Sequence, residues 1–420
     1  MTQYHSVQLS DADHNHFVEN HPNGDLLQLT DWAKAKEFTG WYSRNVAVAD
    51  DAGQVEAVAN IQFKKIKGTP LTFAYASRGF VVDYDNHDAV AAITQAAVKA
   101  AKEERAVYLK IDPDLEREGH QETLKLLETL GFRHTGFKDG MSEQYIQPRQ
   151  TMYTPIDQSD EDLLNSYEPK TRNLVRKAMK SGLEVFEGTR EELDVFHRLM
   201  EETGERDGFA TRDISYFEAL YDNLHPQGHL YYFMIKLMPD KMEAEARQEL
   251  ALIAKDREKV EARRDSKKKD NQLKELATRQ AKQEKLIADA DDLRKDHPNG
   301  LPLSAAILCF CGKKAYYLYA ASSNHYRKLS PNYQLQYDLM RFARDKGATS
   351  YDFGGVSVDP DEDSPYRGLW VFKRMWGTKV SDKIGEFDYV LIPGLYQLMT
   401  YAIPRVRHFM KGFRNKGDNE

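Results

Sequence analysis

The chain has 420 residues, of which 41% are hydrophobic and 11% aromatic, and its 59 basic and 66 acidic side chains give a formal net charge of -7. This length exceeds what one hydrophobic core supports, so it predicts two or three domains. The composition excludes disordered and collagen-like proteins. Because the net charge is negative, any binding of RNA requires a local basic patch.

The sequence gives no sign of a metal site, a disulfide framework or a membrane span. Cys309 and Cys311 are the two cysteines, and His14 and His16 have no third ligand near them in the sequence. The N-terminal residues lack the layout of a signal peptide, and no apolar run reaches the roughly 18 to 20 residues of a membrane span. We therefore expect a cytoplasmic protein with reduced thiols and no bound metal.

The first half begins with a predicted β-hairpin. Residues 45–49 and 55–63 are strand-like and are separated only by Asp-Asp-Ala-Gly. The elements predicted after it are a strand at 71–77, a helix near 88–104, a strand at 106–111 and a hairpin turn within 130–136.

The stretch from Pro239 to His297 has a different composition. It contains no aromatic residue, it has nearly equal numbers of basic and acidic side chains, and its sparse apolar residues recur at helical spacing. The polar run at 265–270 predicts a turn. We expect an antiparallel helical hairpin, of the coiled-coil type, that ends at residues 297–300. A solvated structural role, or dimerisation through this arm, is the simplest interpretation.

The second half repeats the first, with the arm in place of a hairpin turn. Strand-like runs at 229–236 and 303–312 flank the arm, and the elements that follow are a strand at 315–321, a helix near 332–346 and a strand at 350–353. Strand, helix and strand beside antiparallel hairpins predict an α/β (α+β) fold of two GNAT-like acyltransferase domains. The predicted limits are 1–150 plus about 388–420 for domain 1, 151–238 plus 298–387 for domain 2, and 239–297 for the arm.

The GNAT-like layout raises the hypothesis of an acyl-CoA-dependent N-acyltransferase. Such enzymes cradle the CoA pyrophosphate on the backbone amides of a glycine-rich turn at a helix N-terminus. At the matching places this chain has residues 327–333, which contain no glycine, and residues 83–88, which are acidic. Acyl-CoA chemistry therefore remains an alternative with little support from the sequence.

Several short motifs occur in a fixed order along the chain. They are Gln28…Trp32…Lys36, Ser-Arg-Gly at 77–79, Ile-Asp-Pro at 111–113, Lys-Thr-Arg-Asn-Leu-Val-Arg-Lys-Ala at 170–178, Tyr-Gln-Leu-Gln at 333–336, Phe-Gly-Gly at 353–355 and Phe-Lys-Arg-Met-Trp-Gly at 372–377. With these motifs the sequence resembles the FemABX family of non-ribosomal peptidyltransferases over essentially its whole length, including the arm.

The resemblance implies an aminoacyltransferase that takes Ala, Ser or Gly from aminoacyl-tRNA. The acceptor would be the stem-peptide lysine, or a started bridge, of a peptidoglycan precursor, either lipid II or UDP-MurNAc-pentapeptide. No cofactor is implied besides this co-substrate, and lipid II would bring the protein to the cytoplasmic face of the membrane. Besides the acyl-CoA alternative, a non-catalytic coiled-coil scaffold on a GNAT-like core stays open.

The resemblance also implies roles for six residues. Lys373 would stabilise the oxyanion of the tetrahedral intermediate, with Phe372 packed beside the reacting end. The residues matching the family's substrate-binding positions are Lys36, Arg212, Tyr216 and Tyr333. Lys36 lies four residues after Trp32, and Arg212 four before Tyr216, so we expect each pair on one face of a helix. Without the family, solvated helix faces or buried phenols would explain these residues.

Asp112, at the end of a predicted strand, is a candidate general base, although Asp112-Pro113 could equally serve only to turn the chain. Two basic segments are candidates for contact with tRNA or with an anionic membrane surface. One is the helix at 170–180, which carries Arg172, Arg176 and Lys177, and the other is the run at 405–416.

Overall fold

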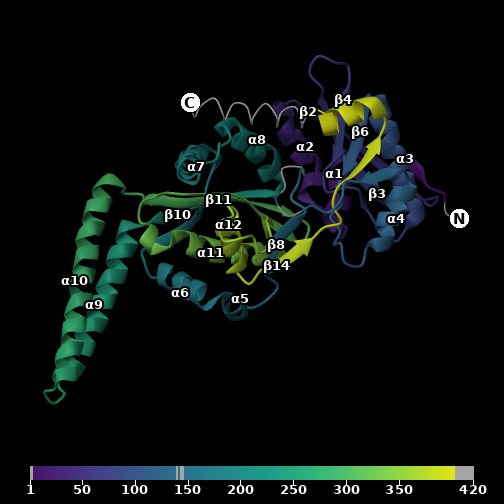
Figure 1. Cartoon of the computed structure of the whole chain (residues 1–420). Helices are drawn as coiled ribbons and strands as arrows, with labels where there is room; N and C mark the ends of the chain where they lie inside the picture. The colour runs from purple at the N-terminus through teal and green to yellow at the C-terminus, as the bar shows by residue number, and fades with distance from the viewer. Residues whose placement is uncertain (1–2, 139–140, 142–145, 403–420) are drawn as a thin grey trace, which may run out of the picture.

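The computed structural model describes residues 3–138, 141 and 146–402, so the basic run predicted at 405–416 lies outside the described residues. Two mixed sheets lie side by side, each with its own helices, and a long helical hairpin projects from the second (Figure 1). Within the described part of the chain, no helix combines the length and the apolar character needed to cross a membrane.

The first sheet contains eight strands. In spatial order they are β1 (His5–Val7), β2 (Trp41–Ala49), β3 (Val55–Lys65), β4 (Thr72–Ala76), β6 (Ala106–Ile111), β15 (Phe387–Val390) and β7 (Phe132–His134), and β5 (Val81–Val82) pairs with β3. The predicted hairpin at 130–136 is wrong, because β7 pairs with β15, a strand about 250 residues later in the chain. Local turn residues could not reveal this long-range partner.

Helix α3 (His87–Glu103) covers the first sheet. Asn86 caps it by accepting a hydrogen bond from the backbone N–H of Ala89, and its buried residues include Val90, Ile93 and Ala97, at helical spacing. The other helices of this half are α1 (Asp11–Asn20), α2 (Thr30–Lys36), α4 (Gln121–Thr129) and α13 (Pro393–Gln397).

The second sheet contains seven strands. In spatial order they are β14 (Lys379–Asp382), β8 (Gln150–Pro155), β13 (Ser350–Gly355), β12 (Lys314–Ser322), β11 (Leu301–Cys311), β10 (Leu230–Leu237) and β9 (Leu183–Glu187). Each sheet has one parallel pair, β4 with β6 and β12 with β13, and every other strand pairing is antiparallel. A helix joins the two strands of each parallel pair, which confirms the predicted repeat and the GNAT-like fold.

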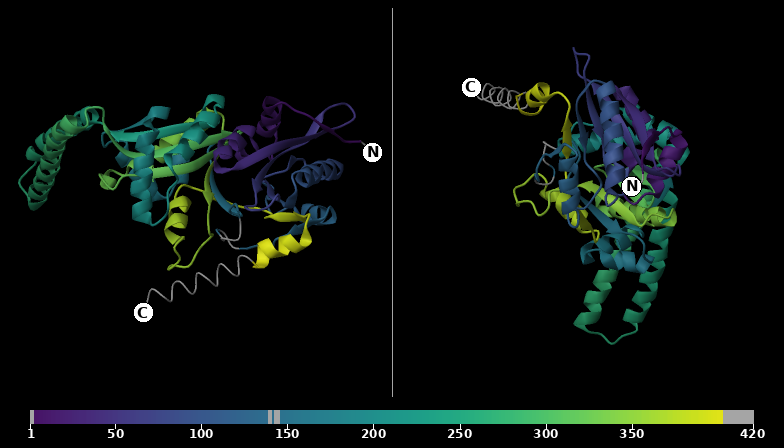
Figure 2. Two further views of the ribbon diagram at one scale, coloured as in Figure 1. Left: turned by 90° about the horizontal axis from the view of Figure 1, so that it is seen from above. Right: turned by 90° about the vertical axis from the view of Figure 1, so that its right-hand side faces the viewer.

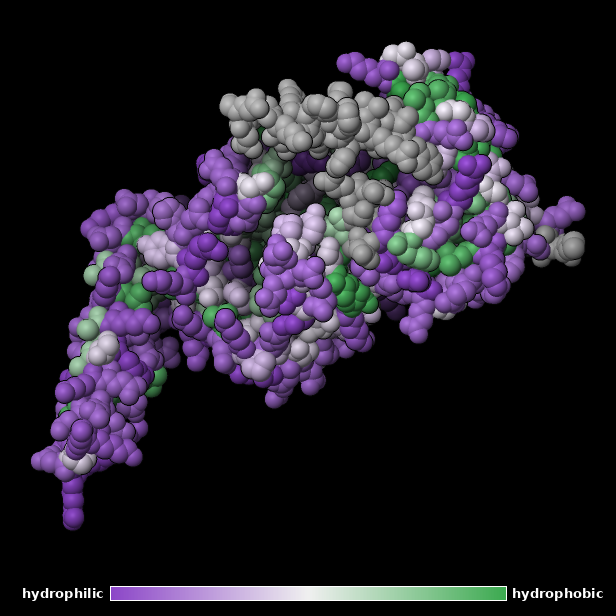
Figure 3. Space-filling model, in the orientation of Figure 1, coloured by the Kyte–Doolittle hydropathy of each residue, from purple (hydrophilic) through white to green (hydrophobic). Residues whose placement is uncertain are grey.

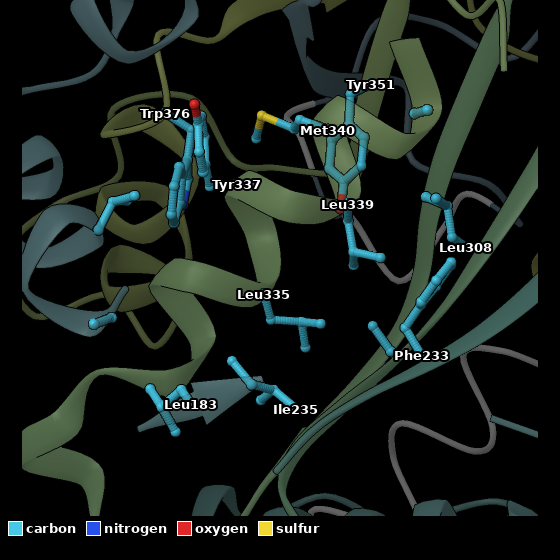
Figure 4. Packing of buried hydrophobic residues seen from close by; sticks show 14 of the residues in the cluster. Leu183, Phe233, Ile235, Leu308, Leu335, Tyr337, Leu339, Met340, Tyr351 and Trp376 are labelled. Atoms are coloured by element: carbon cyan, nitrogen blue, oxygen red, sulfur yellow. The ribbon is translucent and has the colours of Figure 1, made fainter. Parts of the chain in front are cut away.

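Helices cover both faces of the second sheet. Leu335 of α11 (Pro331–Asp345) lies toward Ile235 of β10, and Leu339 lies toward Leu308 of β11, within one buried cluster (Figure 4). Helix α7 (Leu193–Asp207) contacts β11 and β12. The remaining helices of this half are α5 (Asp160–Ser166), α6 (Pro169–Ala178), α8 (Ile214–Leu224) and α12 (Arg367–Arg374).

The arm consists of α9 (Pro239–Glu261) and α10 (Lys267–Asp296) and stands away from both sheets (Figures 1 and 2). It joins β10 to β11, which pair antiparallel, so it does replace a hairpin turn. The turn lies earlier than predicted, at 262–266, because Ser266 caps α10. The outer arm is mostly hydrophilic (Figure 3), and its two helices meet at a small cluster of Ile253, Val260 and Leu276.

The two halves share a hydrophobic core. Trp32 within α2 and Leu29 just before it belong to the same buried cluster as Phe217 of α8 and Ile307 of β11. Helices α2 and α8 also contact each other directly. Because this cluster is buried only when the halves are joined, each half stabilises the other.

A buried carboxylate connects the halves where they meet. Asp114, just after β6, lies 2.5 Å from the Nζ of Lys314 on β12 and 2.6 Å from the Nζ of Lys383, in the segment returning to the first sheet. Burial alone would raise the pKa of Asp114, but Lys314, Lys383 and Arg78 together hold this pKa well below its usual range.

A second ion-pair cluster across the halves involves His229, at the start of β10. Its Nε2 lies 2.5 Å from Oε1 of Glu19, and its Nδ1 lies 3.4 Å from Oδ2 of Asp31. Burial lowers the pKa of His229, but the two carboxylates outweigh it and raise this pKa to about 9. His229 is therefore a cation near neutral pH.

We predict that Asp114→Asn lowers the free energy of unfolding by about 2–4 kcal/mol, because two buried ammonium groups lose their carboxylate. Urea unfolding followed by circular dichroism measures this change. Asp363→Asn, at an exposed carboxylate, is the control and should change the stability little. Equal unfolding midpoints for the two variants would contradict a structural role for the Asp114 cluster.

The His229 cluster predicts a loss of stability at alkaline pH. Because the pKa of His229 is raised, its stabilisation is complete below its ordinary value of 6.5 and is lost as the pH rises through about 9. Allowing for partial exposure to solvent, we expect a contribution of about 2 kcal/mol. Thermal unfolding from pH 6 to 9.5 should show this extra loss in the unmodified protein and in the exposed control His5→Gln, but not in His229→Gln.

Candidate active site

A cavity of about 570 Å³ lies between the two halves. We call it the Lys373 cavity. Its charged lining comes from several separate segments and includes Asp25, Arg78, Asp114, Glu116, Lys314, Asp352, Lys373 and Lys383. Oppositely charged groups therefore face a space large enough for a small ligand.

Lys373 reaches this cavity from α12, near the end of the helix. It is 6% exposed, and its Nζ donates a hydrogen bond of 2.5 Å to the backbone oxygen of Gly355. Burial lowers the pKa of Lys373 to about 8, against the opposing effect of Asp352. Gly354, beside Lys373, has a φ of +76°, a backbone conformation that favours glycine.

Phe372 and Tyr333 lie beside Lys373 but are not part of the cavity lining. Both pack on buried Trp376, with ring centroids 6.2 Å and 5.6 Å away. The Tyr333 hydroxyl contacts the sulfur of Met375, and burial raises its pKa. In this structure the two rings therefore support the segment that carries Lys373.

Lys36, Tyr216 and Arg212 do come together, at a separate place that we call the Lys36 cluster. Lys36 donates a hydrogen bond of 2.5 Å to the Tyr216 hydroxyl, and its Nζ lies 4.3 Å from the Trp32 ring centroid. The Tyr216 hydroxyl is 2.9 Å from that of Tyr319, a member of the cluster that the sequence analysis missed. The spacing of Trp32 and Lys36 does place them on one face of α2, as expected.

Arg212 lies near Tyr216, but the two residues do not share a helix as expected. Helix α8 begins at Ile214, with Asp213 as its cap, so Arg212 precedes the helix. Its guanidinium carbon still lies 5.5 Å from the Tyr216 ring centroid. Burial, and then the charge of Arg212, lower the pKa of Lys36 to about 8. Among the described residues neither cation has a carboxylate partner, so the cluster can bind an anion.

Strand β12 contributes residues to both the Lys373 cavity and the Lys36 cluster. Ile307 pairs with Tyr319 but the next residue, Leu308, pairs with Tyr317, so Leu318 is an extra residue that forms a β-bulge. Tyr316, Tyr317 and Leu318 line the Lys373 cavity, whereas Tyr319 belongs to the Lys36 cluster. β-Bulges are common beside active sites because they redirect side chains.

Asp112 is buried behind the cavity. Its Oδ1 accepts a hydrogen bond of 2.7 Å from the Arg78 N–H, and its Oδ2 lies 3.4 Å from the Arg78 guanidinium. Burial raises the pKa of Asp112 to about 7, against the lowering effect of Arg78. Arg78 lines the cavity and Asp112 does not, so in this structure Asp112 contacts the site only through Arg78.

The basic residues predicted for tRNA lie on α6. Arg176 and Lys177 are exposed, and Lys177 donates to the backbone oxygen of Lys328, whereas Arg172 is half-buried and donates to the Asn165 oxygen. The contact with Lys328 brings exposed Arg327 and Lys328 next to α6, so the basic patch is larger than the sequence indicated. The patch is near α12, since Glu168 pairs with Arg374 at 3.2 Å.

The two cysteines are buried and unpaired. In the described part of the chain, no group of three or more His, Cys, Asp or Glu side chains is arranged to hold a metal ion.

Comparison with known proteins assigns the family. Residues 9–403 match the model of the FemAB family. The chain is 50% identical over 405 residues to proteins named lipid II:glycine glycyltransferase from Staphylococcus aureus strains RF122 / ET3-1 and MSSA476, covering 95% of this chain and 96% of theirs. A crystal structure of FemX superposes with a TM-score of 0.87 at 49% identity, covering 94% of this chain and 100% of that one. The chain therefore belongs to the FemAB family.

Proposed function

We propose that this protein is an aminoacyltransferase that moves glycine from glycyl-tRNA to the side-chain amine of the stem-peptide lysine in lipid II. The relatives named lipid II:glycine glycyltransferase, 50% identical over nearly the whole chain, favour glycine over the Ala and Ser that the sequence left open. The observation that carries the proposal is the buried ammonium of Lys373 in a cavity between the halves.

Lys373 suits the stabilisation of a developing oxyanion. Attack of an amine on the ester carbonyl of an aminoacyl-tRNA places negative charge on the carbonyl oxygen, and a fixed cation in a partly dehydrated site stabilises that charge. With a pKa of about 8, Lys373 carries its proton in about nine molecules of ten at pH 7. Its contribution would be lost as the pH rises through 8.

The Lys36 cluster would hold the pyrophosphate of the precursor. Two cations without a carboxylate partner, with two phenols, offer donors to phosphate oxygens. A pentapeptide spans at most about 18 Å when extended, at roughly 3.3–3.6 Å per residue. Strand β12 runs from the cavity to this cluster. A single precursor would therefore place its phosphates at the cluster and its lysine in the cavity.

The acyl-CoA alternative gains no support from the turn before α11. Pro331 is at the start of that helix and has no N–H, and the N–H of Tyr333 is already bonded to the Ser330 oxygen. A pyrophosphate would find few backbone donors there. The purified protein can be supplied with lipid II and either glycyl-tRNA or acetyl-CoA, and the product that forms identifies the donor.

We predict that Lys373→Met lowers kcat for glycine transfer by about 100- to 1000-fold, as expected for loss of an oxyanion-stabilising group. Purified protein is supplied with glycyl-tRNA and lipid II, and the product is identified by mass spectrometry. Lys379→Met, at an exposed lysine on the neighbouring strand β14, is the matched control and should keep full activity. Equal activity of the two variants would exclude a catalytic role for Lys373, and a complete lack of glycyl product from the unmodified protein would favour the scaffold alternative.

The basic patch on α6 would contact the acceptor stem of the tRNA. We predict that Arg176→Glu with Lys177→Glu weakens tRNA binding by about tenfold and reduces its salt dependence, because fewer counterions are released. Filter binding at several salt concentrations measures both effects. Lys99→Glu on α3, an exposed lysine of the first half, is the control. Unchanged affinity and salt dependence in the double variant would exclude this surface.

A further inference from the structure

Asp352 differs from the other carboxylates of the Lys373 cavity because its Oδ2 has neither an ion pair nor a hydrogen bond among the described residues. Asp114 is paired with two lysines, and Glu116 lies 3.5 Å from Lys383. Asp25 accepts hydrogen bonds from the Tyr316 hydroxyl and from a backbone N–H. No basic side chain of the described residues forms an ion pair with Asp352, although it lines the cavity. The cavity therefore has one carboxylate available to an incoming cation.

Asp352 and Lys373 are held by the same short backbone segment. The Gly354 N–H donates a hydrogen bond of 2.5 Å to Oδ1 of Asp352, and the Gly355 oxygen accepts one from the Lys373 Nζ. The Asp352 carboxylate and the Lys373 ammonium are therefore bonded to neighbouring residues of the backbone, and both side chains line the cavity. An amine held by Asp352 would lie beside an ester carbonyl polarised by Lys373.

We propose that Asp352 binds the ammonium group of the acceptor lysine and removes the proton that prevents its attack. This inference rests on the function proposed above. One proton passes from the acceptor nitrogen to the Asp352 carboxylate, and the nitrogen lone pair then forms the C–N bond with the ester carbonyl. The C–O bond to the tRNA breaks, the second nitrogen proton goes to the departing 3′ oxygen, and Asp352 releases its proton to solvent.

The surroundings of Asp352 suit a base. Burial and the charge of Asp114 raise its pKa, whereas the hydrogen bond from the Gly354 N–H and the charges of Lys383 and Lys373 lower it, and the net shift is upward. A higher pKa brings the carboxylate closer to the roughly 10.4 of a lysine amine and eases proton transfer. The charged or titratable groups facing it are Lys373 from α12, Lys383 before β15, Asp114 after β6, Tyr316 from β12 and Tyr153 from the paired strand β8.

The first test is the variant Asp352→Asn, which keeps the size of the side chain and removes the base. With glycyl-tRNA and lipid II, we expect kcat to fall by about 100- to 10,000-fold. Below pH 8, where Lys373 keeps its proton, the remaining rate should then rise tenfold per pH unit, because only the free amine reacts. Asp352→Glu should recover part of kcat, and Asp363→Asn should behave as the unmodified enzyme. An unchanged rate and pH profile in Asp352→Asn would overturn the inference.

The second test asks whether Asp352 contacts the acceptor ammonium. A precursor with norleucine in place of lysine lacks the ammonium and keeps the carbon chain. We expect the unmodified enzyme to bind it at least tenfold more weakly than the lysine precursor, and Asp352→Asn to bind the two about equally. The same loss of affinity in both enzymes would overturn the inference. Because this test measures binding alone, it does not depend on the activity of the variant.

The failure of this inference is distinguishable from the failure of the proposed function. If the unmodified protein makes no glycyl product from glycyl-tRNA and lipid II, the proposed function fails. If it makes the product while Asp352→Asn matches it in rate and pH profile, the function stands and the assignment of Asp352 is wrong.

Discussion

Asp114 holds together the place where the two halves meet. Its carboxylate forms ion pairs with Lys314, on the strand that forms one wall of the cavity, and with Lys383, where the chain returns from the second sheet to the first. An unpaired ammonium buried in this position would be costly, so the two lysines keep the walls at a fixed separation only while Asp114 is ionised. Lys373 lines the same cavity, so the position of its ammonium within the cavity depends on these walls.

The buried lysines fall into two groups that burial alone would not separate. Burial lowers the pKa of Lys110 and Lys314, but adjacent carboxylates outweigh it, so both stay firmly charged and structural. Lys36 and Lys373 have no ion-pair partner among the described residues, and burial lowers the pKa of each to about 8. A cation that the protein does not neutralise is destabilising unless a ligand supplies the missing charge. The two unpaired lysines thus mark the places where anionic charge would bind or develop.

The elements predictable from the sequence were those set by local pattern. The β2–β3 hairpin, the arm and the helices α3 and α11 follow from turn residues, helical spacing and caps. The pairing of β7 with β15 and the position of Arg212 ahead of α8 depend on distant segments. The family motifs identified Lys36 and Lys373, but Lys314 and Lys383 gave no signal because their partner, Asp114, lies far away in the sequence. Asp352 gave none because the other residues of the cavity come from distant segments. Tertiary packing decides such positions, and no local rule describes it.

The shared core has a consequence for how ligands act on the molecule. Trp32 and Phe217 belong to one buried cluster, and the cavity lining also comes from both halves, so the site exists only while the halves are joined. A ligand that binds this joined state alone stabilises it in proportion to the logarithm of its concentration over its Kd. A precursor reaching from the Lys36 cluster to Asp352 would contact both halves at once. Binding of such a precursor and docking of the halves would then be one coupled equilibrium, so a change that weakens the contacts of Asp114 or His229 would also weaken binding.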